Sequence, residues 1–173
     1  MGTTQRCPAR GFTLIEVLVV LVIVGVVVVA VTLSVGGSSA RVLENAALRA
    51  RGLVALACER SVLSGRDIGF TPIRDGLRFG TYDIEGWRPF RDSVADELRP
   101  RAIGEGVTLA AWRDGDAVAV EDDVPQAPAF ACLSSGELTP FVVEFERADV
   151  DQRWRLEGRL DGGLTLEAID RAR

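Results

Sequence analysis

The hydrophobic residues of the chain fall into three successive patterns. The segment Phe12–Val35 is almost continuously apolar and contains a single ionisable side chain, Glu16. In Ser38–Ser64, apolar residues recur at spacings of three and four, as on one face of a helix. After Gly65, short apolar runs alternate with turn sequences. The patterns predict an α+β fold, in which one long amino-terminal helix precedes a small antiparallel β domain.

The apolar run is long enough to cross a bilayer. A helix over Phe12–Val35 extends about 36 Å, against roughly 30 Å for the hydrocarbon core. It is also longer than the apolar core of an ordinary cleaved secretory signal, which has about 7–15 residues. Residues 1–11 contain two arginines and no acid, the charge bias of a cytoplasmic end. We therefore expect a single-pass helix with its amino terminus in the cytoplasm and the large carboxyl-terminal part outside.

One carboxylate interrupts this apolar run. A charged group inside hydrocarbon costs several kcal/mol, on the order of 3, unless it is paired or near the interface. Glu16 follows the sequence Gly-Phe-Thr-Leu-Ile, which begins at Gly11. This stretch resembles the class III signal peptide of the type IV pilin and type II secretion pseudopilin superfamily. The resemblance implies that a prepilin peptidase cleaves between Gly11 and Phe12 and methylates the new amino terminus on Phe12.

The same resemblance implies a domain organisation and a role for Glu16. Residues 1–11 are the cleaved leader, and residues 12–36 form a transmembrane helix that later packs in the filament core. There the carboxylate of Glu16 neutralises the terminal amine of Phe12 in a neighbouring subunit and sets the assembly register. A mispaired subunit would leave an uncompensated buried charge, which costs about 3 kcal/mol or more. The alternative is a glutamate that reaches the membrane interface.

Residues 37–65 are predicted to form the amphipathic half of the same helix. Its apolar stripe consists of Leu43, Ala46, Ala47, Ala50, Leu53, Val54 and Ala57. Gly65 suits the end of the helix, because glycine readily adopts the left-handed conformation found there. We expect the stripe to pack on a β-rich globular domain formed by residues 66–173.

Turn sequences divide residues 66–173 into short segments of β character. The expected strands are 68–72, 77–82, 107–112, 117–120, 129–133, 141–146, 153–160 and 164–169. We expect loops at 88–106 and 121–128.

A second resemblance lies in the stretch CLSSGELTPFVVEF, which begins at Cys132. It is similar to the signature of the GspH class of type II secretion minor pseudopilins, in which two strands flank a tight turn. The signature residues are Leu133, Ser134, Ser135, Gly136, Glu137, Leu138, Thr139, Pro140 and Phe141. The resemblance implies a structural subunit of the pseudopilus, the filament of a system that exports folded proteins across the outer membrane.

The resemblance also implies partners and a location. The partners are the prepilin peptidase, the major pseudopilin, other minor pseudopilins and, before assembly, the lipid of the inner membrane. The globular domain lies in the periplasm, where its loops are candidates for contact with secreted substrates.

The alternative within the superfamily is a FimT-like minor pilin of type IV pili, in which a DNA-uptake role would favour a basic surface. The formal net charge is −5, and it becomes −7 without residues 1–11. Nucleic-acid binding requires clustered positive charge. We therefore expect no nucleic-acid partner.

The residue inventory argues against catalysis. The chain contains no histidine, which removes the commonest general base and metal ligand. No pair of cysteines has the spacing of a zinc or iron–sulfur site. We expect no enzyme activity, no cofactor and no metal.

Two cysteines, Cys58 and Cys132, remain after removal of the leader, which carries Cys7. In an oxidising periplasm they form either a disulfide or two buried thiols, because sequence does not set the Cα separation that the bond requires.

Overall fold

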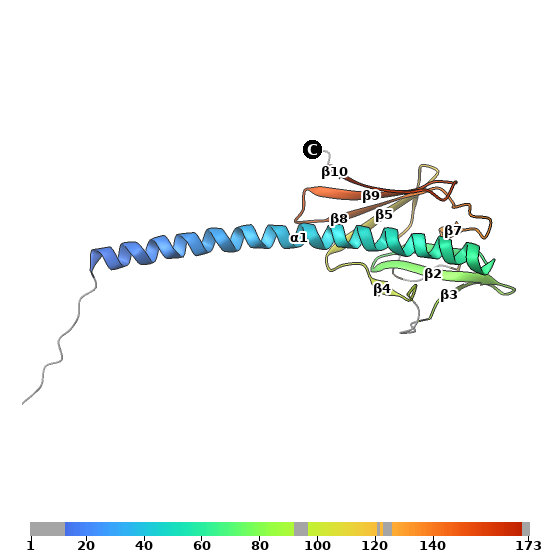
Figure 1. Ribbon diagram of the computed structural model, residues 1–173, viewed down its shortest axis with the longest axis horizontal. Helices are drawn as coiled ribbons and strands as arrows, with labels where there is room; N and C mark the ends of the chain where they lie inside the picture. Colours follow the sequence, from blue (N-terminus) through green and yellow to red (C-terminus); the bar gives the residue numbers. More distant parts are fainter. Residues whose placement is uncertain (1–12, 92–96, 121, 123–125, 171–173) are drawn as a thin grey trace, which may run out of the picture. The chain divides into compact units, whose positions relative to one another are not determined.

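The structure is a computed structural model that describes residues 13–91, 97–120, 122 and 126–170, with the side chains of residues 29–38, 83 and 101 left out. The chain divides into two compact units, Met1–Gly37 and Ser38–Arg173. One helix, α1 (Leu14–Ser64), contributes to both units, and ten strands follow it (Figure 1). The strands are β1 (Ile68–Ile73), β2 (Gly76–Asp83), β3 (Gly86–Pro89), β4 (Arg101–Ala102), β5 (Val107–Arg113), β6 (Asp116–Val118), β7 (Phe130–Cys132), β8 (Phe141–Arg147), β9 (Gln152–Gly158) and β10 (Leu164–Asp170).

The second unit contains two antiparallel sheets. The first sheet has the strand order β3-β2-β1-β7, with β4 also paired to β2. The second sheet has the order β10-β9-β8-β5-β6. The chain crosses between the sheets when it enters β5 from β4, returns to the first sheet at β7, and crosses again into β8. Segments distant in the sequence therefore meet at β7, the strand that leads into the predicted signature.

The carboxyl-terminal half of α1 lies across the strands of the second unit (Figure 1), and its apolar stripe belongs to the same core as residues of both sheets. Its members at the core are completely or almost completely buried, because small alanine side chains let the helix approach the strands closely. These residues are Leu43, Ala46, Ala47, Ala50, Val54 and Ala57. The predicted role of the stripe is confirmed.

Four phenylalanines form the aromatic centre of the core. Phe70 and Phe79 lie on the first sheet with Phe130, and Phe141 lies on the second. The rings of Phe70 and Phe141 meet edge to face, with centroids 5.3 Å apart and planes at 82°. This geometry is favourable for aromatic pairs, and it joins the two sheets at the point where the signature ends.

All eight expected strands are present with small shifts of their ends, but the expected loop at 88–106 was wrong in part. It contains the end of β3 and all of β4. β4 has only two residues, too few to show any alternation. β3 buries only the side chain of Trp87, so it lacks the pattern of a half-buried strand. The expected strand at 153–160 ends early, at Gly158, because Arg159 begins a turn closed by a hydrogen bond from the Gly162 amide to its carbonyl oxygen.

Candidate functional site

The amino-terminal end of α1 is capped by Thr13. The Thr13 hydroxyl accepts a hydrogen bond from the amide of Glu16 at 3.3 Å, and its carbonyl oxygen accepts one from the same amide at 3.1 Å. This is the arrangement of a helix N-cap, and the spacing of Thr13 and Glu16 is that of a capping box. The cap places Glu16 in the first turn of α1, where the helix dipole favours a negative charge.

The first turns of α1 expose apolar side chains on every side. Leu14 is 85% exposed and Val28 55%, and large apolar residues between them are similarly open. A helix that is apolar on all sides is buried in an assembly or a membrane. Among the residues whose side chains are described, no helix is long and apolar enough to cross a membrane. Gly11 and Phe12, the predicted cleavage junction, lie outside the described residues.

The predicted signature forms a closed turn between β7 and β8. The amide of Gly136 donates to the carbonyl oxygen of Leu133 at 3.0 Å, and the amide of Leu133 donates to that of Glu137 at 2.8 Å. Gly136 has a φ of 94°, a conformation that favours glycine. The turn thus satisfies much of its own backbone, which suits a rigid structural element.

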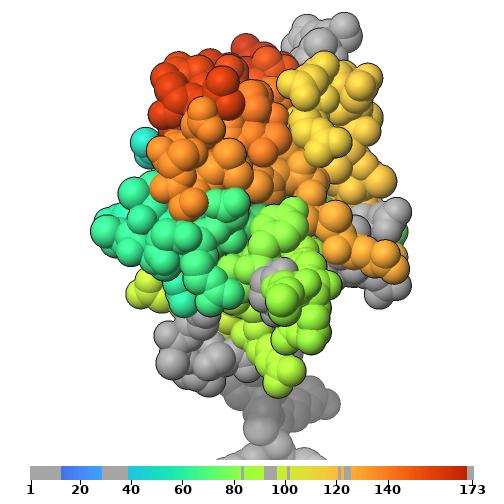
Figure 2. Space-filling view, turned by 90° about the vertical axis from the view of Figure 1, so that its right-hand side faces the viewer, coloured from blue at the N-terminus to red at the C-terminus, as the bar shows by residue number. Residues whose placement is uncertain are grey.

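Two contacts attach the start of the signature to α1, and a third attaches it to Asp67, in the link between α1 and β1. The structure joins Cys58 and Cys132 in a disulfide, with Cα atoms 4.9 Å apart. The completely buried hydroxyl of Ser61 donates to the carbonyl oxygen of Cys132 at 2.8 Å. The amide of Ser134 donates to the Asp67 carboxylate at 2.7 Å. Figure 2 shows the surface of the end of α1, in turquoise, adjoining the orange segment that contains the signature.

The signature also contacts the turn between β9 and β10. The amide of Leu138 donates to the carbonyl oxygen of Leu160 at 3.1 Å. A Cβ atom on Gly158 would lie 2.1 Å from the Phe141 ring and 2.9 Å from Leu138, so only glycine allows this approach. The signature therefore connects α1, the first sheet and the second sheet. We call this set of contacts, centred on residues 132–141, the signature clamp.

Sequence reasoning did not identify Ser61 and Asp67 as parts of the clamp. The position of Ser61 could have indicated its role. It lies four residues after Ala57, so it places a hydroxyl on the same helix face as the apolar stripe. A hydroxyl at such a position is expected to have a buried partner.

Sequence reasoning also missed a charged cluster on the second sheet. Glu144 has a side chain only 6% exposed and accepts hydrogen bonds from Arg153 at 2.9 Å and from Arg155 at 2.7 Å. The hydrogen bonding of Arg155 to Glu144 and the nearby carboxylates raise the pKa of the Arg155 guanidinium. The local sequence Val-Val-Glu-Phe gave one signal, a single acid inside an apolar strand. Buried carboxylates of this kind need cationic partners.

Within the described residues, no group of three or more histidine, cysteine or acidic side chains lies close enough to hold a metal ion. Asp122 forms an exposed ion pair with Arg74 at 2.6 Å.

An amino-terminal helix packed on antiparallel sheets, with a capped and exposed apolar end, defines the class of type IV pilin-like subunits. Residues 6–32 match the family model described as the prokaryotic N-terminal methylation motif. The chain is 36% identical over 141 residues to type II secretion system protein H of Pseudomonas aeruginosa, covering 77% of this chain and 80% of that protein. It is 31% identical to the protein of the same name from Aeromonas hydrophila, covering 87% of each. The chain belongs to the type II secretion system protein H family.

Solved structures agree with this assignment. The minor pseudopilin EpsH from the type 2 secretion system of Vibrio cholerae matches with a TM-score of 0.58 and 26% identity, covering 73% of this chain and 97% of that one. The solution structure of Escherichia coli GspH shares the fold, with a TM-score of 0.55 and 20% identity over 74% of this chain and 87% of that one. The chain is therefore a minor pseudopilin of type II secretion, and the FimT-like alternative is not favoured.

Proposed function

We propose that this chain is incorporated into the type II secretion pseudopilus through the amino-terminal part of α1, and that its role is structural rather than catalytic. The observation that carries the proposal is the exposure of apolar side chains on all sides of residues 14–28, with Glu16 as the single acid among them. Such a surface is stable only in lipid or against other apolar helices. The family itself consists of structural subunits.

Before assembly, residues 12–36 anchor the subunit in the inner membrane and the globular domain lies in the periplasm. Prepilin peptidase removes residues 1–11 after Gly11 and methylates Phe12. The match of residues 6–32 to the methylation motif supports both steps. The major pseudopilin and other minor pseudopilins are the partners of the assembled subunit, and loops of the domain are candidates for contact with secreted substrates.

Glu16 then sets the register of assembly. Cleavage after Gly11 leaves a charged amine on Phe12, adjacent to the residue that caps α1. Thr13 caps the start of the helix, and Glu16 follows Phe12 by four residues in the sequence. Attraction between opposite charges is weak in water and much stronger in an apolar environment. The amine of one subunit and the Glu16 carboxylate of its neighbour therefore favour one axial position over others.

The test is the intact mass of the chain purified from membranes that contain active prepilin peptidase. Wild type should lose residues 1–11 and gain one methyl group, and Gly11→Ala should retain the leader. Gly25→Ala is the matched control, since a Cβ atom there contacts nothing within 4 Å, and it should be processed normally. An unprocessed wild-type chain, with another prepilin processed in the same cells, would overturn the proposal.

Glu16→Gln separates assembly from processing. This variant should be cleaved after Gly11 but should fail to enter isolated pseudopili, and secretion of cargo should fall with it. Normal incorporation of Glu16→Gln would contradict the assigned role of the carboxylate and leave the processing step intact.

A further inference from the structure

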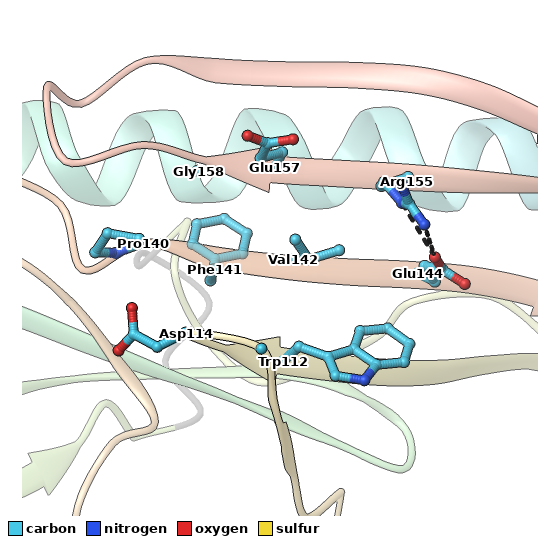
Figure 3. A pocket seen from close by; sticks show the side chains of 10 residues that line it. Trp112, Asp114, Pro140, Phe141, Val142, Glu144, Arg155, Glu157 and Gly158 are labelled. Atoms are coloured by element: carbon cyan, nitrogen blue, oxygen red, sulfur yellow. Dashed lines mark hydrogen bonds and ion pairs between the residues drawn. The ribbon is translucent and has the colours of Figure 1, made fainter.

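The outer face of the second sheet carries a groove that no other described segment covers. Register places Trp112 opposite Val142, and Val142 opposite Glu157, so the three side chains share one face. The alternate residues of β8 point to the core, where Phe141 and Phe145 are buried. The groove has a volume of about 460 Å³. Figure 3 shows it from outside, with α1 behind the sheet.

The floor of the groove is apolar and aromatic. Trp112 and Val142 are half-buried, and Pro140 is exposed beside them. The indole of Trp112 lies along the lower side of the groove in Figure 3. A partly open indole offers both apolar area and the negative face of its π system, which attracts cations.

The charges around this floor are mainly negative. Three carboxylates, Asp114, Glu144 and Glu157, line the groove with one guanidinium, Arg155. Arg155 is held by Glu144, to which its Nε and Nη2 atoms donate at 3.1 and 2.7 Å. Among the described residues, no hydrogen bond or ion pair joins Asp114 or Glu157 to another side chain. The groove therefore has two exposed acids beside an aromatic floor.

We propose that this groove binds an arginine or lysine side chain, flanked by an apolar residue, from a neighbouring subunit of the pseudopilus. The partner's cation lies beside the exposed carboxylates of Asp114 and Glu157, and its apolar neighbour covers Val142 and Trp112. The charge complementarity selects a basic segment over an acidic one. The partner's identity as a subunit rests on the proposed function. The binding chemistry rests on the groove alone.

The chemistry can be tested with the full-length chain in detergent, labelled with 5-fluorotryptophan. The chain has three tryptophans, and Trp112→Phe assigns the resonance of Trp112. The probe is the peptide Ac-Val-Arg-Val-NH2, compared with the same peptide carrying citrulline, which has the shape of arginine without its charge. The arginine peptide should shift the Trp112 resonance alone, and the citrulline peptide should bind on the order of tenfold more weakly.

Asp114→Asn combined with Glu157→Gln should abolish this preference for arginine. Asparagine tolerates the left-handed φ of 54° at position 114, so the turn is preserved. Glu59→Gln, an exposed acid on α1, is the control and should change nothing. Equal binding of the two peptides, no shift at Trp112, or no effect of the double substitution would overturn the binding site.

Photocrosslinking in secreting cells tests the partner. The chain carries p-benzoylphenylalanine in place of Trp112 or, as a control in the apolar helix, of Leu18. The adduct at position 112 should map to another pseudopilus subunit, within two residues of an arginine or lysine, and the double substitution should reduce its yield. An adduct far from any basic residue overturns the proposal. Adducts at position 18 without any at position 112 also overturn the proposed groove partner, but leave the proposed function standing. Adducts at neither position overturn the proposed function.

Discussion

Ser61 and Cys132 are joined by a buried hydrogen bond of 2.8 Å, from the serine hydroxyl to the cysteine carbonyl oxygen. The same hydroxyl also lies 2.9 Å from the carbonyl oxygen of Arg66. One side chain in the last turn of α1 thus holds both the chain that leaves the helix and the strand that leads into the signature. The disulfide from Cys58 reinforces the same junction one helical turn earlier.

Ser61→Ala should destabilise the globular domain by about 1–3 kcal/mol, because the buried carbonyl oxygen of Cys132 loses its donor. Urea unfolding of the full-length chain in detergent, followed by tryptophan fluorescence, measures the loss, since all tryptophans lie in the second unit. Ser64→Ala is the control. Its hydroxyl makes only a long 3.5 Å bond to Ser61, so it should change stability by less than about 0.5 kcal/mol. Equal effects of the two substitutions would contradict a specific role for Ser61.

The fold could be predicted from sequence wherever a pattern extends over many residues. The stripe of α1 repeats over several turns, and β8 and β10 are flanked by clear turn sequences. β4 could not be predicted, because it has two residues and forms only by pairing with Gly76 and Leu77 of β2. β4 forms only when β2 is in place beside it, so the residues of β4 themselves carry no pattern that predicts a strand.

The amino-terminal motif could be predicted from sequence, whereas the contacts of the signature clamp could not. The segment Gly11–Glu16 is contiguous, so the motif could be recognised directly. The clamp joins residues far apart in the chain, with a sequence separation of 71 between Ser61 and Cys132 and of 67 between Asp67 and Ser134. A single sequence contains no record of which distant polar groups meet. The signature could be recognised in the sequence as a run of residues. Its contacts with α1 and with the second sheet are visible only in the structure.

The disulfide should be present in the chain isolated from secreting cells. Alkylation under denaturing conditions without reduction should leave Cys58 and Cys132 unlabelled, and prior reduction should expose both. Cys58→Ala with Cys132→Ala should lower the free energy of unfolding by about 2–5 kcal/mol, since the bond closes a long loop. Reduced wild type should behave similarly. Cys7→Ser should alter neither result, and free labelling of Cys58 and Cys132 without reductant would contradict the prediction.

Glu144 organises the charges on the outer face of the second sheet. Glu144→Gln should lower the free energy of unfolding by about 1–3 kcal/mol, because it leaves Arg153 and Arg155 without their shared buried carboxylate. The two arginines are partly exposed, so the loss should be smaller than for a fully buried ion pair. The urea midpoint of the full-length chain measures it. Glu59→Gln, an exposed acid on α1 away from this cluster, should have almost no effect, consistent with the small contribution of exposed charges. A loss at Glu59 as large as at Glu144 would refute the assignment.

Asp149 should make the stability of the domain depend on pH in the acid range. The Ser39 hydroxyl donates to its carboxylate at 2.5 Å and the Arg147 Nε at 2.6 Å. These two bonds, the first above all, hold the pKa of Asp149 below its ordinary value of 3.8. The folded state therefore favours the ionised carboxylate, so the stabilisation is present above pH 3.8 and is lost as the pH falls through the lowered native pKa.

Comparison of wild type with Asp149→Asn between about pH 7 and pH 2 tests this linkage. Wild type should be the more stable by a constant margin at neutral pH, and the margin should shrink as the carboxylate is protonated, because the asparagine does not titrate. Thermal unfolding in one detergent at each pH gives the difference. Asp151→Asn, at an exposed position two residues away, should run parallel to wild type. A margin that stays constant down to the lowest pH would show that Asp149 contributes through packing rather than through its charge.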